Sequence, residues 1–424
     1  MGEEEQCLSK AFQYLSSQVR GMTEAVQSDT SLKPDAKKAK VKKGLEALRD
    51  KLLGLTLIFV ELEDEDSAYI TFETLNARGK DLRLSDLVKN HLARNLKKDT
   101  KTVDSLKERW TQVFDLIDGS TADISIDGFI HHQWLSARSY VSEKSAYKEI
   151  KRIIKKAQAS DYLDGLVSES GLYRTLFEPE YRKWSKEERP VREALEALVT
   201  FRVVQPTPLL LSLLAAYDAK VLRLTHLKGA VSAIEAFHFQ FTAIASMSSS
   251  GGMSKMYASA GRAIRNCTNS QQAVKEIRAL RKKLRDRLPA PLDFDAGFLG
   301  LAYSNEVTRH RKLIRHVLGR IARVGLSRAT MDYGELTIEH LIPQSSTALS
   351  AESVANVGNL VFVAPETNQE LGTKPFGDKR KILKNSKEVW VDPILGKAAS
   401  WGDATILKRA RHLAETARTR VWTI

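Results

Sequence analysis

The sequence predicts a mainly α protein, in which a helical scaffold carries a small α+β domain at the C-terminal end. Gly and Pro are scarce, at 23 and 11 of 424 residues, and apolar residues recur three and four positions apart along most of the chain. Two short alternating runs, at 335–343 and 358–363, indicate strands instead. The length suits two or three domains. We expect three, at 1–98, 99–290 and 291–424.

The composition limits the partners and the compartment. Lys and Arg number 66 against 52 Asp and Glu, and the formal net charge of +14 favours a polyanion, nucleic acid before an anionic membrane. The two cysteines, Cys7 and Cys267, lie far apart and form no disulfide framework. No long uncharged apolar run indicates a membrane span, and the start is acidic rather than signal-like. We therefore expect a cytoplasmic protein that makes no membrane contact.

The first region combines helical and extended patterns. Residues 7–26 predict an amphipathic helix, 33–43 form a basic stretch, and 55–62 resemble a strand. Further on, Asn76 to Gly79 predicts a tight turn, and Ser85 is placed as the N-cap of a helix with Asp86 in its first turn.

The second region is a helical block. Helical spacing of apolar residues is clear at 106–117, 147–157, 191–201 and 274–288, and the nearly continuous apolar run at 206–214 predicts a buried helix. The string SMSSSGGMSK at 246–255 predicts a flexible loop. His131 and His132 are adjacent on a predicted helix and therefore point apart, so they cannot chelate one ion together. The basic clusters at 33–43 and 275–288 are interpreted as solvated helix faces.

The third region carries the candidate chemistry. The string ELTIEHLIP predicts a short strand that presents Glu339 and His340 before Pro343 ends it, and GNLVFV predicts a second strand that Asn359 opens. A turn or short helix then presents Asn368. Such a ribbon followed by a helix can bring one carboxylate, one imidazole and two carboxamides together.

This group suits phosphodiester hydrolysis. A neutral imidazole at His340 can take a proton from water near pH 7, and the oxygens of Glu339 and Asn368 suit one Mg²⁺ that also contacts phosphate. Asn359 has both a donor and an acceptor, so it can tie the His340 loop to the second strand.

The same strings resemble a known family. TIEHLIPQS, GNLVFV, TNQELGTKPFGDKRKIL and the closing helix WGDATILKRARHLAETARTRVW are similar to the His-Asn-His (HNH, ββα-metal) nuclease domain of GmrSD-type modification-dependent restriction endonucleases, over nearly all of 330–424. The resemblance implies His340 as general base, Glu339 and Asn368 on Mg²⁺ or Mn²⁺, Asn359 as the middle Asn, and Lys379 facing phosphate. Trp401, Ile406, Arg409, Leu413 and Trp422 match the closing helix and are expected to pack. It also implies double-stranded DNA as substrate, with a preference for modified or phage DNA.

A second resemblance lies in the first region. FETLNARGKDLRLSDLVKNHL is similar to the end of the N-terminal nucleotide-dependent domain of that family, although Asp86 follows Ser85 directly. Asn76 and Arg78 could contact a nucleotide or DNA, and the alternative interpretation is a turn that caps a helix. The family's Gln-Arg and Asp-Gly-Gln-Arg motifs do not occur. We therefore expect 1–98 to be the truncated end of the sensor domain, and three explanations stay open: a fragment, a split-gene product, or a subunit whose sensor is another chain. We do not expect this chain alone to depend on NTP.

These observations favour a metal-dependent DNA endonuclease of the restriction or phage-defence type. Two other hypotheses stay open. The chain could be a non-catalytic DNA-binding or assembly subunit with a degenerate nuclease fold, or an NTP-dependent regulatory enzyme that acts through Asn76 to Gly79.

Overall fold

The computed structural model describes residues 3–56, 83–96, 100–248, 251–327 and 334–424, and it divides the chain into two compact units, Met1–Thr71 and Phe72–Ile424. The division falls between residues 71 and 72, whereas the sequence predicted boundaries at 98 and 290. The three expected domains remain a prediction. Each unit is described by itself. Most of the strand-like run at 55–62, together with Asn76 and Arg78, lies outside the described residues.

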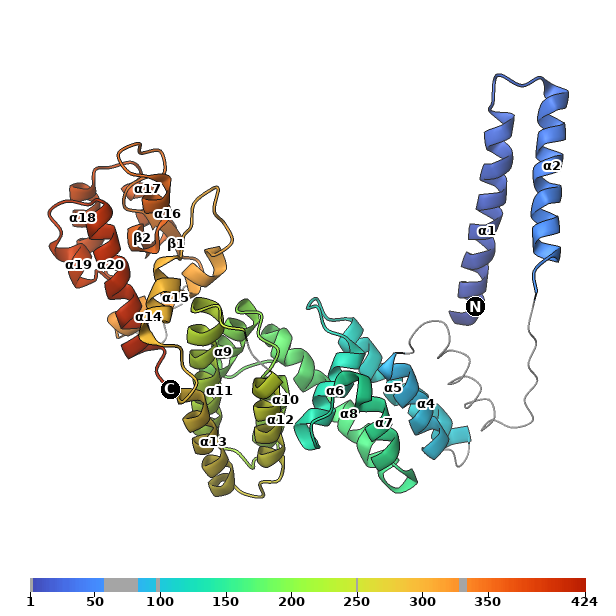
Figure 1. The fold of residues 1–424 in the computed structure, drawn as a ribbon, viewed down its shortest axis with the longest axis horizontal. Coiled ribbons are helices and arrows are strands. Elements are labelled where there is room, and N and C mark those ends of the chain that lie inside the picture. The colour runs from blue at the N-terminus through green and yellow to red at the C-terminus, as the bar shows by residue number, and fades with distance from the viewer. Residues whose placement is uncertain (1–2, 57–82, 97–99, 249–250, 328–333) are drawn as a thin grey trace. The chain divides into compact units, whose positions relative to one another are not determined.

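The first unit contains a pair of helices, α1 (Glu3–Gln27) and α2 (Pro34–Leu53), which run side by side (Figure 1). The first confirms the amphipathic helix expected at 7–26. The second contains the basic stretch at 33–43, begins with Pro34 and buries no side chain. A proline fits the first turn of a helix because its missing N–H would have no partner there.

The second unit is a succession of helices that ends in a small domain with two strands (Figure 1). None of the helices in the described part of the chain has both the length and the apolar character needed to cross a bilayer. Before the strands the helical elements are α4 (Leu84–Leu96), α5 (Thr100–Asp118), α6 (Ile126–Ala137), α7 (Glu143–Ile153), α8 (Lys156–Phe177), η1 (Pro179–Tyr181), α9 (Arg189–Thr200), α10 (Thr207–Asp218), α11 (Leu224–His238), η2 (Phe239–Ile244), α12 (Gly251–Arg265), α13 (Ser270–Arg285), α14 (Pro291–Leu299) and α15 (Arg311–Gly325).

Most of the expected helices are present, and three expectations were wrong. Ser85 is not an N-cap, because α4 begins at Leu84 and the backbone N–H groups of Leu84 and Ser85 donate to Asp127. The apolar run at 206–214 is the buried helix α10, which packs against α12 and α6. The single helix expected at 147–157 is instead two, because Ile154 and Lys155 adopt extended backbone between α7 and α8. Within the Ser/Gly string at 246–255, residues 246–248 are a loop, but the residues from Gly251 on are helical because α12 begins there.

The C-terminal domain contains β1 (Thr337–His340) and β2 (Leu360–Val363), which form an antiparallel pair with Glu339 opposite Val361 and His340 opposite Leu360. The helix α17 (Pro365–Leu371) follows β2 and contacts β1. The remaining helical elements are α16 (Ala351–Ala355), η3 (Val357–Asn359), α18 (Phe376–Asn385), α19 (Pro393–Lys397), α20 (Asp403–Thr416) and η4 (Ala417–Val421).

The strand pair lies between two hydrophobic cores. Alternate residues of a strand point to opposite faces. Leu360 and Phe362 belong to the large core shared with the helical block, whereas Val361 and Val363 belong to a smaller core with α17 to α20. The pair is therefore packed on both faces, which fixes its register and the direction of each side chain.

Candidate active site at the strand pair

His340, the last residue of β1, is buried and held by a backbone carbonyl. Its Nε2 lies 2.9 Å from the carbonyl oxygen of Tyr303, and its ring lies against the Tyr303 ring, with centroids 5.9 Å apart. Tyr303 lies in the segment between α14 and α15, where its N–H donates to the Ala355 carbonyl. The position of the imidazole is therefore fixed by a segment far from β1 in the sequence.

The Tyr303 carbonyl also determines which nitrogen of the His340 ring carries the proton. A carbonyl can only accept, so Nε2 carries the proton and Nδ1 of the neutral ring keeps its lone pair. Burial lowers the pKa of His340, and the Lys379 ammonium acts in the same direction, against the opposing effects of Tyr303 and Glu339. The neutral form of His340, which can accept a proton at Nδ1, is therefore favoured near pH 7.

Glu339 and Lys379 form a buried ion pair. Lys379 Nζ lies 2.5 Å from Glu339 Oε1 and 2.7 Å from the carbonyl oxygen of His340. The Lys379 side chain is fully buried, and that of Glu339 is 15% exposed. This differs from the expectation that Lys379 faces phosphate, because its ammonium points inward and orients β1. Lysine is rarely buried without a partner, and here the carboxylate of Glu339 is that partner.

Asn359 joins the end of β1 to the start of β2, as expected from its donor and acceptor groups. Its amide Nδ2 donates to the carbonyls of Ile342 (3.1 Å) and Val354 (2.8 Å). Its Oδ1 accepts from the Ile342 N–H (2.9 Å) and from Trp401 Nε1 (3.1 Å). The side chain is fully buried. Asn359 therefore positions the chain that follows His340 and does not reach solvent.

Two residues of the closing segment do more than pack. Trp401 donates to Asn359 as described, and Arg409 of α20 donates to the carbonyls of Gly358 (2.8 Å) and Leu360 (2.7 Å). Asp392 pairs with Arg409 at 2.7 Å. A Cβ at Gly358 would overlap the Ile406 carbonyl, so a glycine is required for α20 to approach this closely. Together these contacts fix the start of β2.

Asn368 of α17 lies on the Glu339 face of the strand pair. Its Nδ2 donates to the Thr337 hydroxyl at 2.8 Å, and Thr337 and Glu339 share a face because they are two residues apart. Among the described residues, no hydrogen bond is found to Oδ1 of Asn368 or Oε2 of Glu339. Two hard oxygen donors fit Mg²⁺, which keeps several waters and takes further ligands from substrate phosphate.

The structure places all five residues expected at the third-region site at the strand pair or its ends, but Glu339 and Asn368 share one face while His340 points to the other. Their joint role stays a prediction, and two further residues that the sequence did not indicate contact His340. The carbonyl of Tyr303 has no sequence signal, because every residue has one. Gln344, four residues after His340, has its Nε2 3.5 Å from Nδ1 of His340. In the described part of the chain no cluster of three or more His, Cys, Asp or Glu could hold a metal ion. The pair of Glu339 and Asn368 as metal ligands therefore stays a prediction.

Comparison with known proteins identifies the C-terminal domain. Residues 293–416, from α14 to α20, match the family described as GmrSD restriction endonucleases, C-terminal domain. This confirms the family resemblance that the C-terminal motifs indicated, whereas the resemblance of the first region lies outside the matched segment and stays a prediction. No curated protein matches the chain.

Proposed function

We propose that the chain is a metal-dependent DNA endonuclease of the HNH type that hydrolyses phosphodiester bonds. The observation that carries the proposal is the fixed, neutral imidazole of His340 beside Glu339, on a strand pair followed by α17, inside the segment that matches the restriction-endonuclease family.

In this proposal His340 is the general base. Its Nε2–H stays bonded to the Tyr303 carbonyl, and Nδ1 takes a proton from a water molecule as that water attacks phosphorus. Gln344 lies beside Nδ1 and can orient the water. Because Nε2 is held by an acceptor, the imidazolium that forms gains a stronger hydrogen bond to the same carbonyl.

Glu339 and Asn368 would hold the divalent cation, Mg²⁺ or Mn²⁺. When bound, the cation supplies positive charge for the phosphate oxygens and the leaving oxygen. Lys379 holds Glu339 in place from the interior, and Thr337 holds Asn368. Lys379, Thr337 and Asn359 are therefore positioning residues in this mechanism.

Double-stranded DNA is the proposed substrate, since the chain has a net charge of +14 and the family acts as restriction endonucleases. A preference for modified or phage DNA, a separate sensor chain and a cytoplasmic location belong to the same proposal. Nucleotide contact by Asn76 or Arg78 is a further hypothesis about residues outside the described part of the chain.

Plasmid cleavage with Mg²⁺ or Mn²⁺ tests the proposal on phage and unmodified DNA. We expect His340→Ala to lose roughly 10²- to 10⁴-fold in rate, the usual contribution of a general base. Glu339→Gln should also lose activity. The matched control is His412→Ala, a half-buried histidine of α20 outside the strand pair, which should cut like the parent.

Two outcomes would contradict the proposal. Nicking by His340→Ala at the parent rate would remove His340 as the base. DNA binding without any metal-dependent cutting by the parent would favour the non-catalytic subunit instead.

A further inference from the structure

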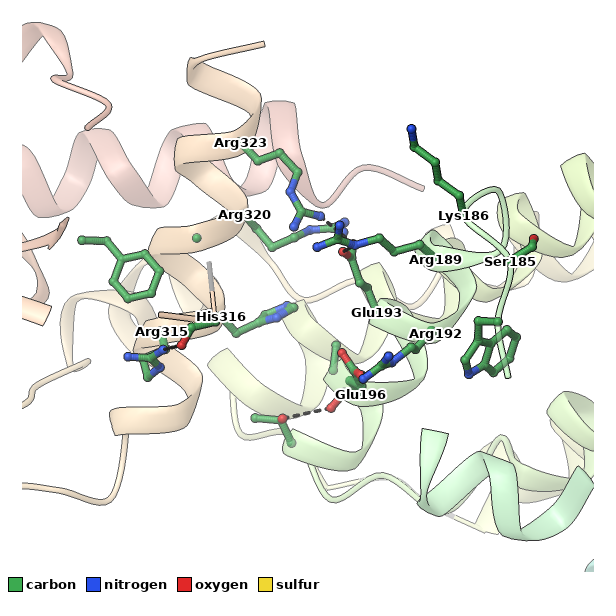
Figure 2. A pocket seen from close by; sticks show the side chains of 16 residues that line it. Ser185, Lys186, Arg189, Arg192, Glu193, Glu196, Arg315, His316, Arg320 and Arg323 are labelled. Carbon is green, nitrogen blue, oxygen red and sulfur yellow. Dashed lines mark hydrogen bonds and ion pairs between the residues drawn. The ribbon is translucent and has the colours of Figure 1, made fainter. Parts of the chain in front are cut away.

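A basic cavity lies between the helical block and the C-terminal domain. It has a volume of about 730 Å³, and its two main walls are α9 and α15. The lining also includes Trp184, Ser185 and Lys186 before α9, Gly334, and Phe362 of β2. Figure 2 shows that Arg320 and Arg323 extend from α15 toward Arg189 and Glu193 of α9. The volume is typical of small-ligand sites.

The charge of the lining is strongly positive. Six cationic side chains face two carboxylates, and the set consists of Lys186, Arg189, Arg192, Arg315, Arg320 and Arg323 with Glu193 and Glu196. Like charges gathered from two helices repel each other, and a cavity concentrates their field. An anion bound there would relieve this repulsion.

Three of the arginines are held in place by the two carboxylates of the lining, Arg320 pairs with Glu235 outside the lining, and Arg315 donates to backbone carbonyls. Glu193 accepts from Arg189 Nε at 2.9 Å and from Arg323 Nη1 at 2.5 Å, so one carboxylate links α9 to α15. Arg192 pairs with Glu196 at 2.6 Å. A guanidinium has five N–H donors, so an arginine already bonded to a carboxylate can still donate to a phosphate. The donors are therefore ordered before a ligand arrives.

The cavity reaches the same face of the strand pair as His340. Phe362 lies opposite Ile338, and His340 lies opposite Leu360, two positions along. Residues two apart point to the same face, about 7 Å from each other along a strand. Leu360 and Phe362 of this face belong to the large core, so the cavity borders the buried side of the strand pair.

We propose that the α9–α15 cavity is a binding site for phosphate groups. One wall, α9, lies outside the segment 293–416 that matches the family, so the site combines that domain with the helical block. Backbone phosphates of DNA and a small polyphosphate share the chemistry that the cavity recognises. The DNA source rests on the proposed function, whereas the polyphosphate source does not.

A pair of exposed cations at the cavity allows a test that spares the fold. The cavity double variant is Lys186→Gln with Arg192→Gln, since both side chains are exposed. The control double variant, Lys183→Gln with Lys312→Gln, removes the same charge from exposed positions that do not line the cavity. Binding is measured on the full chain in EDTA, with a duplex oligonucleotide and with inorganic triphosphate as probes.

If DNA is the source, the cavity double variant should bind duplex roughly tenfold more weakly than the control. The slope of log affinity against log salt should fall in size by about 2, one for each phosphate that the variant no longer neutralises. If a free polyphosphate is the source, triphosphate should bind the parent and the control but not the cavity double variant, with duplex binding equal in both doubles.

The phosphate site would be overturned if each probe bound the cavity double variant as tightly as it bound the control double variant. It would also be overturned if the parent bound neither probe. No divalent cation is present in these measurements. A failure of the proposed nuclease chemistry would therefore show only in plasmid cleavage and would leave the binding results intact.

Discussion

At the scale of single residues, the chemistry depends on which nitrogen of His340 carries the proton. The Tyr303 carbonyl fixes that proton on Nε2, and burial favours the neutral ring. Lys379 lowers the pKa of His340 and Glu339 raises it, so burial determines the direction of the net shift. In the proposed mechanism the imidazole can therefore act as a base without an acidic partner on its other nitrogen.

The first prediction is a pH–rate profile with a displaced acid limb. Because the folded pKa of His340 lies below its ordinary value of 6.5, the acid limb of the cleavage rate should be centred below pH 6.5. Plasmid cleavage at constant ionic strength between pH 5 and 8 measures it. An acid limb centred above 6.5 would contradict the burial argument.

The same shift has a consequence for stability. Between the lowered folded pKa and 6.5 the unfolded state binds more protons at this site, so the free energy of unfolding should rise with pH over that window. His340→Gln cannot titrate and should lose this part of the pH dependence. Urea unfolding of parent and variant at several pH values serves as the control measurement.

At the scale of elements, Lys379 joins α18 to β1. Its ammonium bonds both the Glu339 carboxylate and the His340 carbonyl, from a fully buried position. Removing one partner of a buried ion pair leaves the other charge unpaired, and this is more costly than removing both.

We therefore predict a strong coupling between Lys379 and Glu339. Lys379→Met should lower the free energy of unfolding by about 3–5 kcal/mol. Adding Glu339→Leu should recover at least half of that loss, because the unpaired carboxylate is then absent. Chemical denaturation of the parent, both single variants and the double variant measures the coupling. Additive losses would mean that the pair does not act as a unit.

The sequence predicted the elements of the site better than their contacts. Strand alternation and the proline after the strand placed Glu339 and His340 correctly, because these signals are local. The direction of Lys379 was not predictable, since lysine is usually exposed and only the packing of α18 on β1 turns it inward. The Tyr303 carbonyl and the α9–α15 cavity depend on segments far apart in the chain, which no local pattern reports.

At the scale of the second unit, the C-terminal segment is anchored in the helical block. Trp422 is fully buried, stacks on Phe239 with ring centroids 3.7 Å apart, and donates from Nε1 to Glu235 Oε1 at 2.7 Å. Burial alone would raise the pKa of Glu235. The charge of Arg320 and the hydrogen bonds from His316 and Trp422 instead hold the pKa of Glu235 below its usual value of 4.5. This contribution to stability is present above pH 4.5 and is lost as the pH falls through the lowered pKa.

The last prediction is that Trp422 stabilises both parts of this unit together. Trp422→Ala should lower the free energy of unfolding by about 3–5 kcal/mol, because it opens a cavity beneath Phe239 and removes a donor from Glu235. Trp422→Phe keeps a ring and removes only the donor, so it should cost about 1–3 kcal/mol. The control, Leu407→Ala at an exposed position of α20, should stay within about 0.5 kcal/mol.

Hydrogen exchange then distinguishes a shared anchor from a local one. Because Trp422 follows α20 and η4 but contacts α11 and η2, Trp422→Ala should speed amide exchange both in the strand pair and in α11. Faster exchange in only one of the two would mean that the C-terminal domain and the helical block are stabilised separately. In that case α9 and α15 could move relative to each other, and the cavity between them would form only when a ligand binds.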